Sequence, residues 1–504
     1  GSGGGASLSG EGGEGGGVII LEVSYEGELW NDGNITADGN SGGCPGGGGG
    51  AGGSVLVKLA GGGRLSGSGM VTANGGNACS DGSLGGGGSG GRVAIFAWDA
   101  DSFLGSLLAE GGWQGNSDLV LPAAGTVLTN FTSGAKEGTT LKVRNTNAYA
   151  LGVYSTKGIT LLNESMESSS SIDTNGVKLD VQEGGMLTVT DSANVKLSKI
   201  LPGDGSGVLT IADHAQMQSS ATTSGNLTVK GVQLVINGGS MAGWTIVTVE
   251  SGGILRLSSN GNAKPETGGV PLTPNGTYVF DMLVIADGGR VDVAPASNVL
   301  SLVNNTSLVS IRAGTIMVAS GGILTGNGYG YPATERDTSA LDEQNIPYSG
   351  TASNGRNGGA GGGHAGAGAN GYLNSRPGGA YDSTFAPTQS GGGGGAGAWG
   401  SGGAGGSAIH LVTTGDLIVQ GQVSVDGESA TVGSGGGGGA GGSLWVDCGG
   451  LLIGEGIISA KGGDGDGGLE ADSRLFGGAG SGGRILLLSK DTSSFLGQVK
   501  AMGG

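Results

Sequence analysis

Short stretches with two alternating sides recur along this chain. Val55, Val57 and Leu59 alternate with Leu56 and Lys58, and a side-chain period of two is the pattern of a β-strand. Stretches of this kind begin after residues 17, 54 and 92, and again after residues 407, 443 and 484. We expect Lys58 and Asp447 to face outward. The residues expected to face the interior are Val55, Val57, Leu59, Leu444, Val446 and Cys448.

The glycine runs before these strands belong to a module that occurs twice. The copy at residues 46–112 opens GGGGGAGGSVLVKL, and the copy at 435–504 opens GGGGGAGGSLWVDC. Both continue through a G-x-L-x-G-x-G-x-I/V-x-A-x-G-G segment and a further glycine run to SFLG and a final GG. Residues 92–112 match 484–504 at a constant offset of 392. Repetition of this kind is typical of solenoid proteins.

The spacing of the strands predicts an all-β fold. Strand starts are 37 and 38 residues apart in the N-terminal part, and 36 and 41 residues apart in the C-terminal part. A second short strand follows within each repeat, as at residues 70–73 and 457–460. Two strands and their turns per repeat, stacked in parallel, predict a parallel β-helix or β-solenoid. No stretch has the period of a long amphipathic helix.

The glycine runs themselves have two interpretations. They are either flexible loops or ordered, polyproline-II-like segments packed side by side, since backbones without Cβ atoms can approach closely. Because the runs recur at the same place in every repeat, we favour order.

The composition divides the chain into four parts. Residues 1–112 and 391–504 are the glycine-rich solenoid modules. Residues 113–325 are poor in glycine and contain several strand–Gly-Gly–strand patterns, which predict a less regular parallel β-helix. Residues 326–390 hold many tyrosines, prolines and glycines and are expected to form a structured loop region, since loops of that length usually provide function or contacts.

The charge balance limits the partners. Glycine accounts for 121 of 504 residues and the net charge is −18. An acidic chain without basic patches is a poor nucleic-acid ligand, and the absence of a glycine at every third position with proline between excludes collagen. No apolar run approaches the roughly 20 residues of a membrane span.

Three cysteines are too few for a disulfide framework. Cys44 and Cys79 lie in glycine-rich turns about one repeat apart, so they are a candidate disulfide in a secreted chain. Cys448 aligns with Leu59, on the side of its strand expected to face inward. We interpret it as a small buried hydrophobe.

The pattern GGGGGAGGS-strand, GxLxGxGxIxAxGG, GGGGSGGR-strand resembles glycine-rich tandem repeats in very large extracellular proteins of microbes and protists. The resemblance covers residues 1–112 and 317–504. It implies a surface, adhesive or fibre-forming protein that is extracellular or on the cell surface. It brings no catalytic motif and therefore assigns no residue roles.

Candidate chemistry is sparse. The three histidines, His214, His364 and His410, are far apart in sequence, and no HExxH, GxSxG or CxxC spacing occurs. Because parallel β-helices include polysaccharide-degrading enzymes, we consider a groove lined by Asp213, His214, Asp281 and Asp292. The competing interpretation places these residues on solvent-facing turns and strands. We expect a protein that is not an enzyme and has no cofactor.

Two further features are candidates for ligands or modification. Oxygen-rich turns with Asp464, Asp466, Glu470 and Asp472 are a weak candidate for one calcium ion, and solvated carboxylates are the alternative. Asn-x-Ser/Thr sequons, which accept N-glycans in a secreted eukaryotic protein, occur at Asn34, Asn130, Asn163, Asn226, Asn275, Asn304 and Asn305.

Three functions follow as hypotheses. The first is a structural extracellular protein that associates with copies of itself, end to end, into a fibre, filament or surface appendage. The second is an adhesin that binds carbohydrate through its loops, and the third is a β-helix enzyme that degrades polysaccharide. The modules at 1–112 and 391–504 are expected to adopt one fold and to stack on neighbouring copies, or to be part of a longer protein.

Overall fold

The regular elements of the protein are all β-strands. The structure, a computed structural model, describes residues 1–6, 10–79, 85–113, 122, 125–134, 136, 138–144, 177–182, 186–189, 194–202, 207–212, 216–219, 225–259, 276–294, 308–334, 358–372, 375–398, 400–433, 435–467 and 476–504. Within these ranges no helix occurs. Most strands pair in parallel, so the prediction of an all-β fold with parallel sheets is confirmed.

The chain divides into two compact units. The first comprises Gly1–Ile211, Ala215–Gly225 and Val229–Leu234. The second comprises Ala212–His214, Asn226–Thr228 and Val235–Gly504. Strands β14 (Gly207–Ala212), β16 (Gly225–Val229) and β17 (Val232–Asn237) contain residues of both. The four-part division made from composition is finer than this and stays a prediction.

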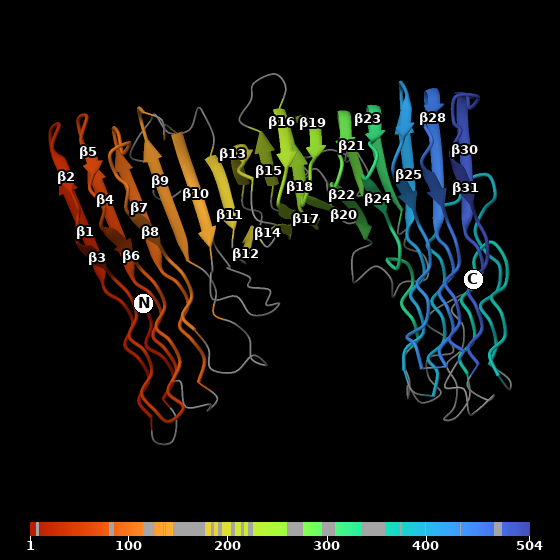
Figure 1. The fold of residues 1–504 in the computed structure, drawn as a ribbon, viewed down its shortest axis with the longest axis horizontal. Coiled ribbons are helices and arrows are strands. Elements are labelled where there is room, and N and C mark those ends of the chain that lie inside the picture. Colours follow the sequence, from red (N-terminus) through yellow and green to blue (C-terminus); the bar gives the residue numbers. More distant parts are fainter. Residues whose placement is uncertain are drawn as a thin grey trace, which may run out of the picture. The chain divides into compact units, whose positions relative to one another are not determined.

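The first unit is built on one long sheet (Figure 1). Its strands, in spatial order, are β1 (Val18–Val23), β4 (Ser54–Leu59), β7 (Arg92–Ala97), β9 (Thr126–Phe131), β10 (Gly138–Arg144), β11 (Val177–Gln182), β13 (Asn194–Ile200) and β15 (Gln216–Ser219). Shorter pairings join β2 (Glu28–Trp30) to β5 (Arg64–Ser66), β3 (Asn34–Thr36) to β6 (Met70–Thr72) and β8 (Ser106–Leu108), and β12 (Met186–Val189) to β14.

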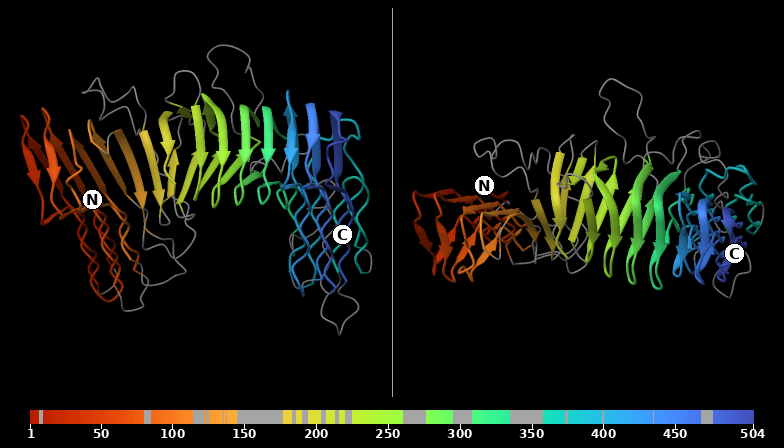
Figure 2. Two further views of the ribbon diagram at one scale, coloured as in Figure 1. Left: turned by 45° about the horizontal axis from the view of Figure 1, so that its top comes forward. Right: turned by 90° about the horizontal axis from the view of Figure 1, so that it is seen from above.

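The second unit contains two parallel sheets, whose strands lie side by side in both views of Figure 2. One sheet has the order β19 (Trp244–Val249), β21 (Thr277–Ile285), β23 (Val309–Val318), β25 (Ala408–Thr413), β28 (Ser443–Ile453) and β30 (Arg484–Asp491), with β26 (Leu417–Val419) beside β23 and β28. The other has the order β20 (Ile254–Ser258), β22 (Arg290–Ala294), β24 (Ile323–Thr325), β27 (Gln422–Ser424), β29 (Ile457–Ser459) and β31 (Gln498–Lys500). The short β18 (Ser240–Ala242) precedes β19.

The strand register predicted from the sequence is confirmed. The six residues expected inside are at most 6% exposed, namely Val55, Val57, Leu59, Leu444, Val446 and Cys448. Lys58 is exposed and Asp447 is partly exposed. Val55 lies opposite Ile19 and Val93 in the neighbouring strands, so equivalent apolar residues of successive repeats stack into a continuous core.

One pairing departs from the expected parallel arrangement. β10 runs antiparallel to β9, with Leu141 opposite Leu128. The two strands are separated by only six residues, and a connection of that length joins antiparallel neighbours, whereas a parallel crossover needs a dozen residues or more. The run of parallel strands that starts at β1 is interrupted at this hairpin.

The glycine segments run on from the strands in each unit (Figure 1) and are ordered by backbone hydrogen bonds. Residues 48–53 donate their N–H groups to three neighbouring segments in turn, so that donors three residues apart share one neighbour. The bonds are Gly50 to Asn40 and Gly53 to Ala37, Gly48 to Gly5 and Ala51 to Ser2, and Gly49 to Gly86 and Gly52 to Ser89, at 2.7–2.9 Å. The prediction that these runs are ordered is therefore supported by their own hydrogen bonds, which flexible loops would lack.

The glycine segment of the second module repeats this pattern. Residues 437–442 also donate in three directions, and every third donor shares a neighbour. The bonds are Gly437 to Gly395 and Ala440 to Gly392, Gly438 to Gly478 and Gly441 to Ser481, and Gly439 to Glu428 and Gly442 to Val425, at 2.7–3.0 Å.

Glycine is required at fixed positions of these segments. A Cβ atom on Gly50 would collide with the carbonyl oxygen of Glu14, one repeat earlier, and one on Gly439 would collide with that of Ala404. These positions recur every three residues because the segment has three residues per turn, so every third side chain would point at the preceding segment. Real Cβ atoms essentially never approach a carbonyl oxygen within 3.0 Å, so the close packing excludes every other residue.

The two modules share their strands and their hydrogen bonds. In the first, β3, β6 and β8 pair in the order in which β27, β29 and β31 pair in the second. The carboxylate of Asp38 accepts the N–H of Asn74 at 2.5 Å, and that of Asp426 accepts the N–H of Lys461 at 2.6 Å. The expectation that the two sequence copies have one fold agrees with these matched contacts.

Candidate functional site

The strongest candidate site is the face of the repeat that contains β30, on the side where no described strand pairs. We define the β30 face as β30, β31 and the glycine-rich residues 477–483 and 501–504. β30 pairs with β28 on one side, and no described strand pairs with its other side. Ile485 and Leu487 are half-buried, whereas Leu444 and Val446, their partners in β28, are buried. The inward-facing residues of β30 therefore match those of an inner strand, but no described strand packs beside them.

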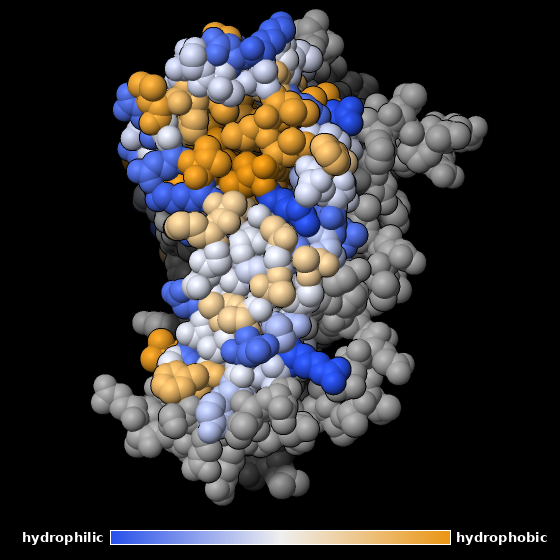
Figure 3. Space-filling view, turned by 90° about the vertical axis from the view of Figure 1, so that its right-hand side faces the viewer, coloured by the Kyte–Doolittle hydropathy of each residue, from blue (hydrophilic) through white to orange (hydrophobic). Residues whose placement is uncertain are grey.

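Apolar side chains gather on this side of the molecule. Figure 3 shows an apolar area on the side where β30 and β31 lie. Leu488 is 49% exposed and Leu496 is 75% exposed. Exposed apolar patches of this kind are typical of surfaces that bind another macromolecule.

A matching uncovered face occurs at β1. Among the described strands, β1 pairs with β4 alone. Ile19, Leu21 and Val23 are half-buried, while their partners in β4 are buried. Val18 and Ile20 are 71% and 58% exposed. The two faces differ in charge: residues 10–40 contain seven carboxylates and no lysine or arginine, whereas residues 484–504 contain three basic side chains and one acid.

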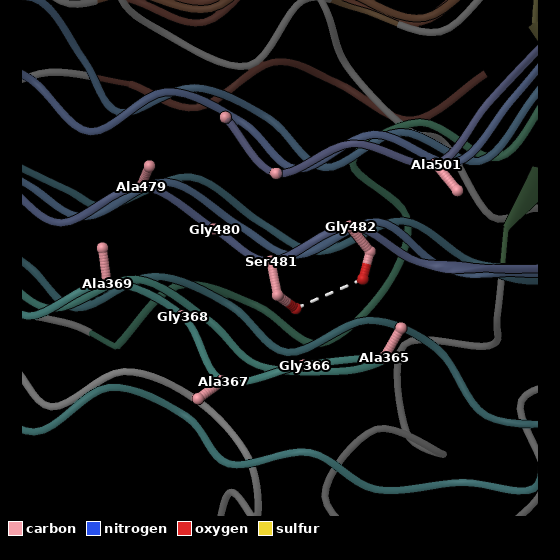
Figure 4. A pocket seen from close by; sticks show the side chains of 12 residues that line it. Ala365, Gly366, Ala367, Gly368, Ala369, Ala479, Gly480, Ser481, Gly482 and Ala501 are labelled. Carbon is pink, nitrogen blue, oxygen red and sulfur yellow. Dashed lines mark hydrogen bonds between the residues drawn. The ribbon is translucent and has the colours of Figure 1, made fainter.

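A groove opens in the glycine-rich part of the β30 face. Its volume is about 460 Å³ and its lining consists of Gly, Ala and Ser only. The walls are residues 365–369, 479–482, 501, 503 and 504, which come from three separate stretches of the chain (Figure 4). The Ser481 hydroxyl donates to the carbonyl oxygen of its neighbour Gly482 at 3.3 Å. No side chain in the lining carries a charge.

A buried polar cluster lies behind this face. The Ser443 hydroxyl contacts Asp382 Oδ2 at 2.9 Å, His364 Nε2 at 3.3 Å and the carbonyl oxygen of Gln389 at 2.6 Å. His364 Nε2 lies 3.4 Å from Asp382 Oδ2, and its Nδ1 lies 2.7 Å from the carbonyl oxygen of Gly441. The sequence signalled none of this, because the three side chains are 18 and 61 residues apart and no local motif joins them.

Asp382 is ionised in this cluster. Burial raises the pKa of its carboxyl group, but hydrogen bonds from His364 and from the amides of Gln389, Ser383 and Thr388 outweigh burial and lower the pKa to about 2. The residue also has a left-handed backbone, with φ of 69°. Asp is one of the few residues other than glycine that adopt this conformation at a modest cost.

The cluster and its neighbours join the loop that contains Tyr381 and Asp382 to the second module by hydrogen bonds. Arg484 donates to the carbonyl oxygen of Tyr381 at 2.8 Å, and the Tyr381 hydroxyl donates to that of Ser390. Although Ser, His and Asp together resemble a nucleophilic triad in composition, His364 and Ser443 are fully buried and the Asp382 side chain is 3% exposed. The Ser443 hydroxyl is thus buried within a hydrogen-bonded network of the kind that fixes packing in a protein interior.

His410 belongs to a second polar group on the same sheet. Its ring stacks on Trp445 at 4.0 Å between centroids, and its Nε2 lies 2.9 Å from Asp447 Oδ2. Burial lowers the pKa of His410, the Asp447 carboxylate opposes this, and Arg312 adds to the lowering. Asp213 and His214 lie outside the described residues.

The interpretation of Asp292 as solvent-facing is wrong. Its side chain is 3% exposed and pairs with Arg290 Nε at 2.5 Å and with Arg256 at 3.3 Å. Tyr329 donates to the same carboxylate at 3.4 Å, and burial, followed by the Asp292 charge, raises the tyrosine's pKa. A buried carboxylate needs such partners, but sequence spacing does not reveal them. Asp281 is exposed on β21.

The two cysteine residues singled out by the sequence form a disulfide. Cys44 and Cys79 are bonded, with their Cα atoms 5.2 Å apart. Cys448 is free and buried, as expected for a small hydrophobe.

The acidic turn of the second module uses one of its carboxylates internally. Asp466 Oδ2 accepts the N–H of Gly435 at 2.7 Å. Glu470 and Asp472 lie outside the described residues. In the part of the chain that the structure describes, no three His, Cys, Asp or Glu side chains are grouped as a metal site.

Three of the seven sequons lie in described strands. Asn34 and Asn226 are exposed, and Asn130 is partly exposed. The other four, at Asn163, Asn275, Asn304 and Asn305, lie outside the described residues. Glycosylation at these asparagines stays a prediction.

The fold defines an all-β protein with parallel sheets and no recognisable catalytic centre among its described residues. No family model, no curated protein and no solved structure matches the chain. The described residues also contain no helix of the length and hydrophobicity that a membrane crossing requires.

Proposed function

We propose that this protein is a structural component of an extracellular surface, a β-solenoid that associates end to end with copies of itself. The observation that carries the proposal is the pair of uncovered faces at β1 and β30. β1 alternates exposed and half-buried residues, and β30 is half-buried over its first four residues and mostly exposed after them. An unpaired parallel edge accepts a strand of matching register.

The solenoid itself rests on the register of the repeats. Val55 and its equivalents stack from β1 to β9 with no shift in pairing, which is how successive coils of a solenoid bury one core. The period-three hydrogen bonding of the glycine segments matches the three residues per turn of polyproline II. We therefore propose coils with one glycine-rich side and one side made of strands.

The charges of the two faces favour head-to-tail contact. Carboxylates dominate the repeat of β1, while Arg484, Lys490 and Lys500 lie on or beside β30 and β31. Opposite charges attract two copies in one orientation and disfavour like faces meeting. A contact between unlike faces is head-to-tail, and such contacts extend into a filament when the rotation between copies does not close a ring.

Glu11 and Glu14 restrict this contact to the strands. Glu14 stands one repeat before Gly50, at the position where inner repeats carry glycine because a Cβ atom would strike the preceding segment. Its side chain therefore points toward an incoming copy. We expect the glycine layers of two copies to stay apart, and the double substitution Glu11→Gly/Glu14→Gly to strengthen association.

The disulfide supports the proposed location. Disulfides persist in oxidising surroundings such as the outside of the cell, and Cys44 and Cys79 are bonded. The carbohydrate-binding alternative has one observation in its favour: Phe385, in the segment that follows Asp382, is 87% exposed, and exposed aromatic rings are enriched at binding surfaces.

Negative-stain microscopy and sedimentation velocity test the proposal. We expect filaments of the intact chain that shorten as ionic strength rises, because salt screens the attraction between the faces. Leu488→Glu places an acid on the β30 face and should abolish them. Val432→Glu is the matched control, since Val432 is 93% exposed away from the strands of this face. Dispersed monomers of the parent chain at high concentration would overturn the proposal.

A further inference from the structure

We propose that Arg290, which the buried carboxylate of Asp292 orients on the outer side of β22, binds the carboxylate of a uronic acid in an acidic polysaccharide. This is a binding site for a ligand other than a copy of the chain. Its residues all belong to the second compact unit, and β20 and β22 have strands on both sides in their sheet. The inference therefore does not depend on the faces at β1 and β30.

The first support is the position of Arg290. The two valines of β22 are buried in the core, so Arg290 and Asp292 point to the opposite, outer side of the strand. In the neighbouring strands, Ile254 and Ile323 lie opposite Arg290, and both are half-buried. The Arg290 side chain thus stands between two apolar side chains on the outside of the sheet.

The second support is the orientation of its guanidinium group. Arg290 Nε donates to Asp292 Oδ1 at 2.5 Å, and the Arg290 side chain is 43% exposed. Its two terminal nitrogens have no hydrogen-bond partner among the described residues. Because the guanidinium group is planar, a bond at Nε fixes the direction of the terminal pair. This pair of donors matches the two oxygens of a carboxylate.

The third support is an excess of positive charge. Arg256 Nη2 lies 3.3 Å from Asp292 Oδ2 and donates to the Tyr329 hydroxyl at 2.9 Å. Two guanidinium groups thus share one carboxylate, and neither has another ion pair among the described residues. The Nε atom of Arg256 is buried without an acceptor. In a chain with a net charge of −18, this group keeps one positive charge and more donors than acceptors, which favours an anion.

The neighbours of Arg290 point to the class of anion. Ile254 and Ile323 offer apolar contact on either side of the guanidinium group, and binding sites commonly combine apolar walls with a few placed polar groups. A uronic acid carries its carboxylate on a ring with C–H groups, so it meets both requirements. The choice of a polysaccharide rests on the extracellular location proposed above.

Affinity electrophoresis of the intact chain tests this inference, in native gels at neutral pH that contain polygalacturonate. We expect the retardation to saturate as the polymer concentration rises. The methyl-esterified polymer has the same sugar without the charge, and its dissociation constant should be at least tenfold larger, which corresponds to about 1.4 kcal/mol. Added salt should weaken the retardation, because it screens the charges.

Three substitutions complete the test. Arg290→Gln removes the charge and the pair of donors, and should raise the dissociation constant at least tenfold, about 1.4 kcal/mol. Arg290→Lys keeps a positive charge beside Asp292, which protects the fold, but should also weaken binding because lysine has no planar pair of donors. Circular dichroism checks that each variant is folded.

Arg312→Gln is the matched control. Arg312 is exposed on β23 of the other sheet, and its Nε lies 3.5 Å from Ser310 Oγ, without an ion pair among the described residues. The substitution removes the same charge and should leave the affinity unchanged.

The inference is overturned by equal retardation in the methyl-esterified polymer, by unchanged affinity of both Arg290 variants, or by an equal loss in Arg312→Gln. Tighter binding of sulfated dextran, or equal binding of polyglutamate, would overturn the assignment to a uronic acid. Measuring binding in the Leu488→Glu background separates it from filament formation. Loss of filaments with intact polysaccharide binding in the parent chain would count against the proposed function alone.

Discussion

The two glycine-rich modules close their tips by different chemistry. In the first module, Cys44 and Cys79 form a disulfide across the tip. In the second, the residue aligned with Cys79 is Asp466, and its carboxylate accepts the N–H of Gly435 at 2.7 Å. A covalent bond in one copy thus corresponds to a charge-assisted hydrogen bond in the other.

The backbone under the two tips is the same. Cys79 donates its N–H to the carbonyl oxygen of Gly47 at 3.1 Å, and Asp466 donates to that of Gly436 at 3.0 Å. The glycine spacing therefore sets the arrangement of the segments, and the closure of the tip is added to it. A disulfide is not needed to define this fold.

The second module also carries additional segments. Gly359 donates to the carbonyl oxygen of Gly435, and Gly362 to that of Gly438, at 2.8 and 2.9 Å. Residues 358–372 thereby extend the glycine layer sideways, and the Ser443, His364 and Asp382 cluster secures the loop that follows. The first module shows no corresponding cluster among its described residues.

A large effect is expected from the glycines that both modules share. Gly50→Ala and Gly439→Ala each place a methyl group on a carbonyl oxygen of the preceding repeat. We expect each to destabilise its own compact unit by about 3 kcal/mol, because the tightly packed segments cannot move apart. Guanidinium unfolding followed by circular dichroism measures the loss.

Gly379→Ala is the control for both variants, since its new methyl group meets nothing within 4 Å. A strong effect of one variant and none of the other would show that the two glycine layers are not equivalent.

The tips should differ in stability. Cys79→Ser opens a loop with a sequence separation of 35 residues, which should destabilise the first unit by about 3–4 kcal/mol on the chain-entropy estimate. Asp466→Ala, the matched change in the second unit, removes one hydrogen bond to a charged group and should cost about 1.5–3 kcal/mol. Both are measured by thermal unfolding under non-reducing conditions.

Adding a reducing agent to the parent chain should reproduce the effect of Cys79→Ser and leave the second unit unchanged. An equal response of the two units to reduction would contradict the assignment of distinct closures.

The smallest expected effect is a pH dependence confined to the second unit. Because the pKa of Asp382 is lowered from 3.8 to about 2, its carboxylate stabilises the folded state fully above pH 3.8, and this contribution disappears as the pH falls through 2. Asp382→Asn should unfold more easily than the parent at pH 6, and the difference should shrink toward pH 2. A difference that stays constant over this range would exclude the carboxylate charge as its source.

The sequence predicted the strands and the repeated glycine layer because both depend on short periods. Val55 and Leu444 were placed correctly since alternation along a strand decides which side is buried. The β9–β10 hairpin was missed because neither strand was among those predicted, although a connection of six residues is too short for a parallel crossover. The Asp292 pairs and the Ser443 cluster were missed because each joins residues from distant parts of the chain. Only the three-dimensional stacking of repeats brings such residues together.

The three-way hydrogen bonding of the glycine segments bears on mechanical strength. An edge strand of a sheet can be peeled away bond by bond, because it is attached along one line. A segment such as 46–53 is attached along three lines at once, so pulling on it loads bonds in all three directions together. In the proposed filament, a pull on one glycine segment would therefore be distributed over its three neighbours.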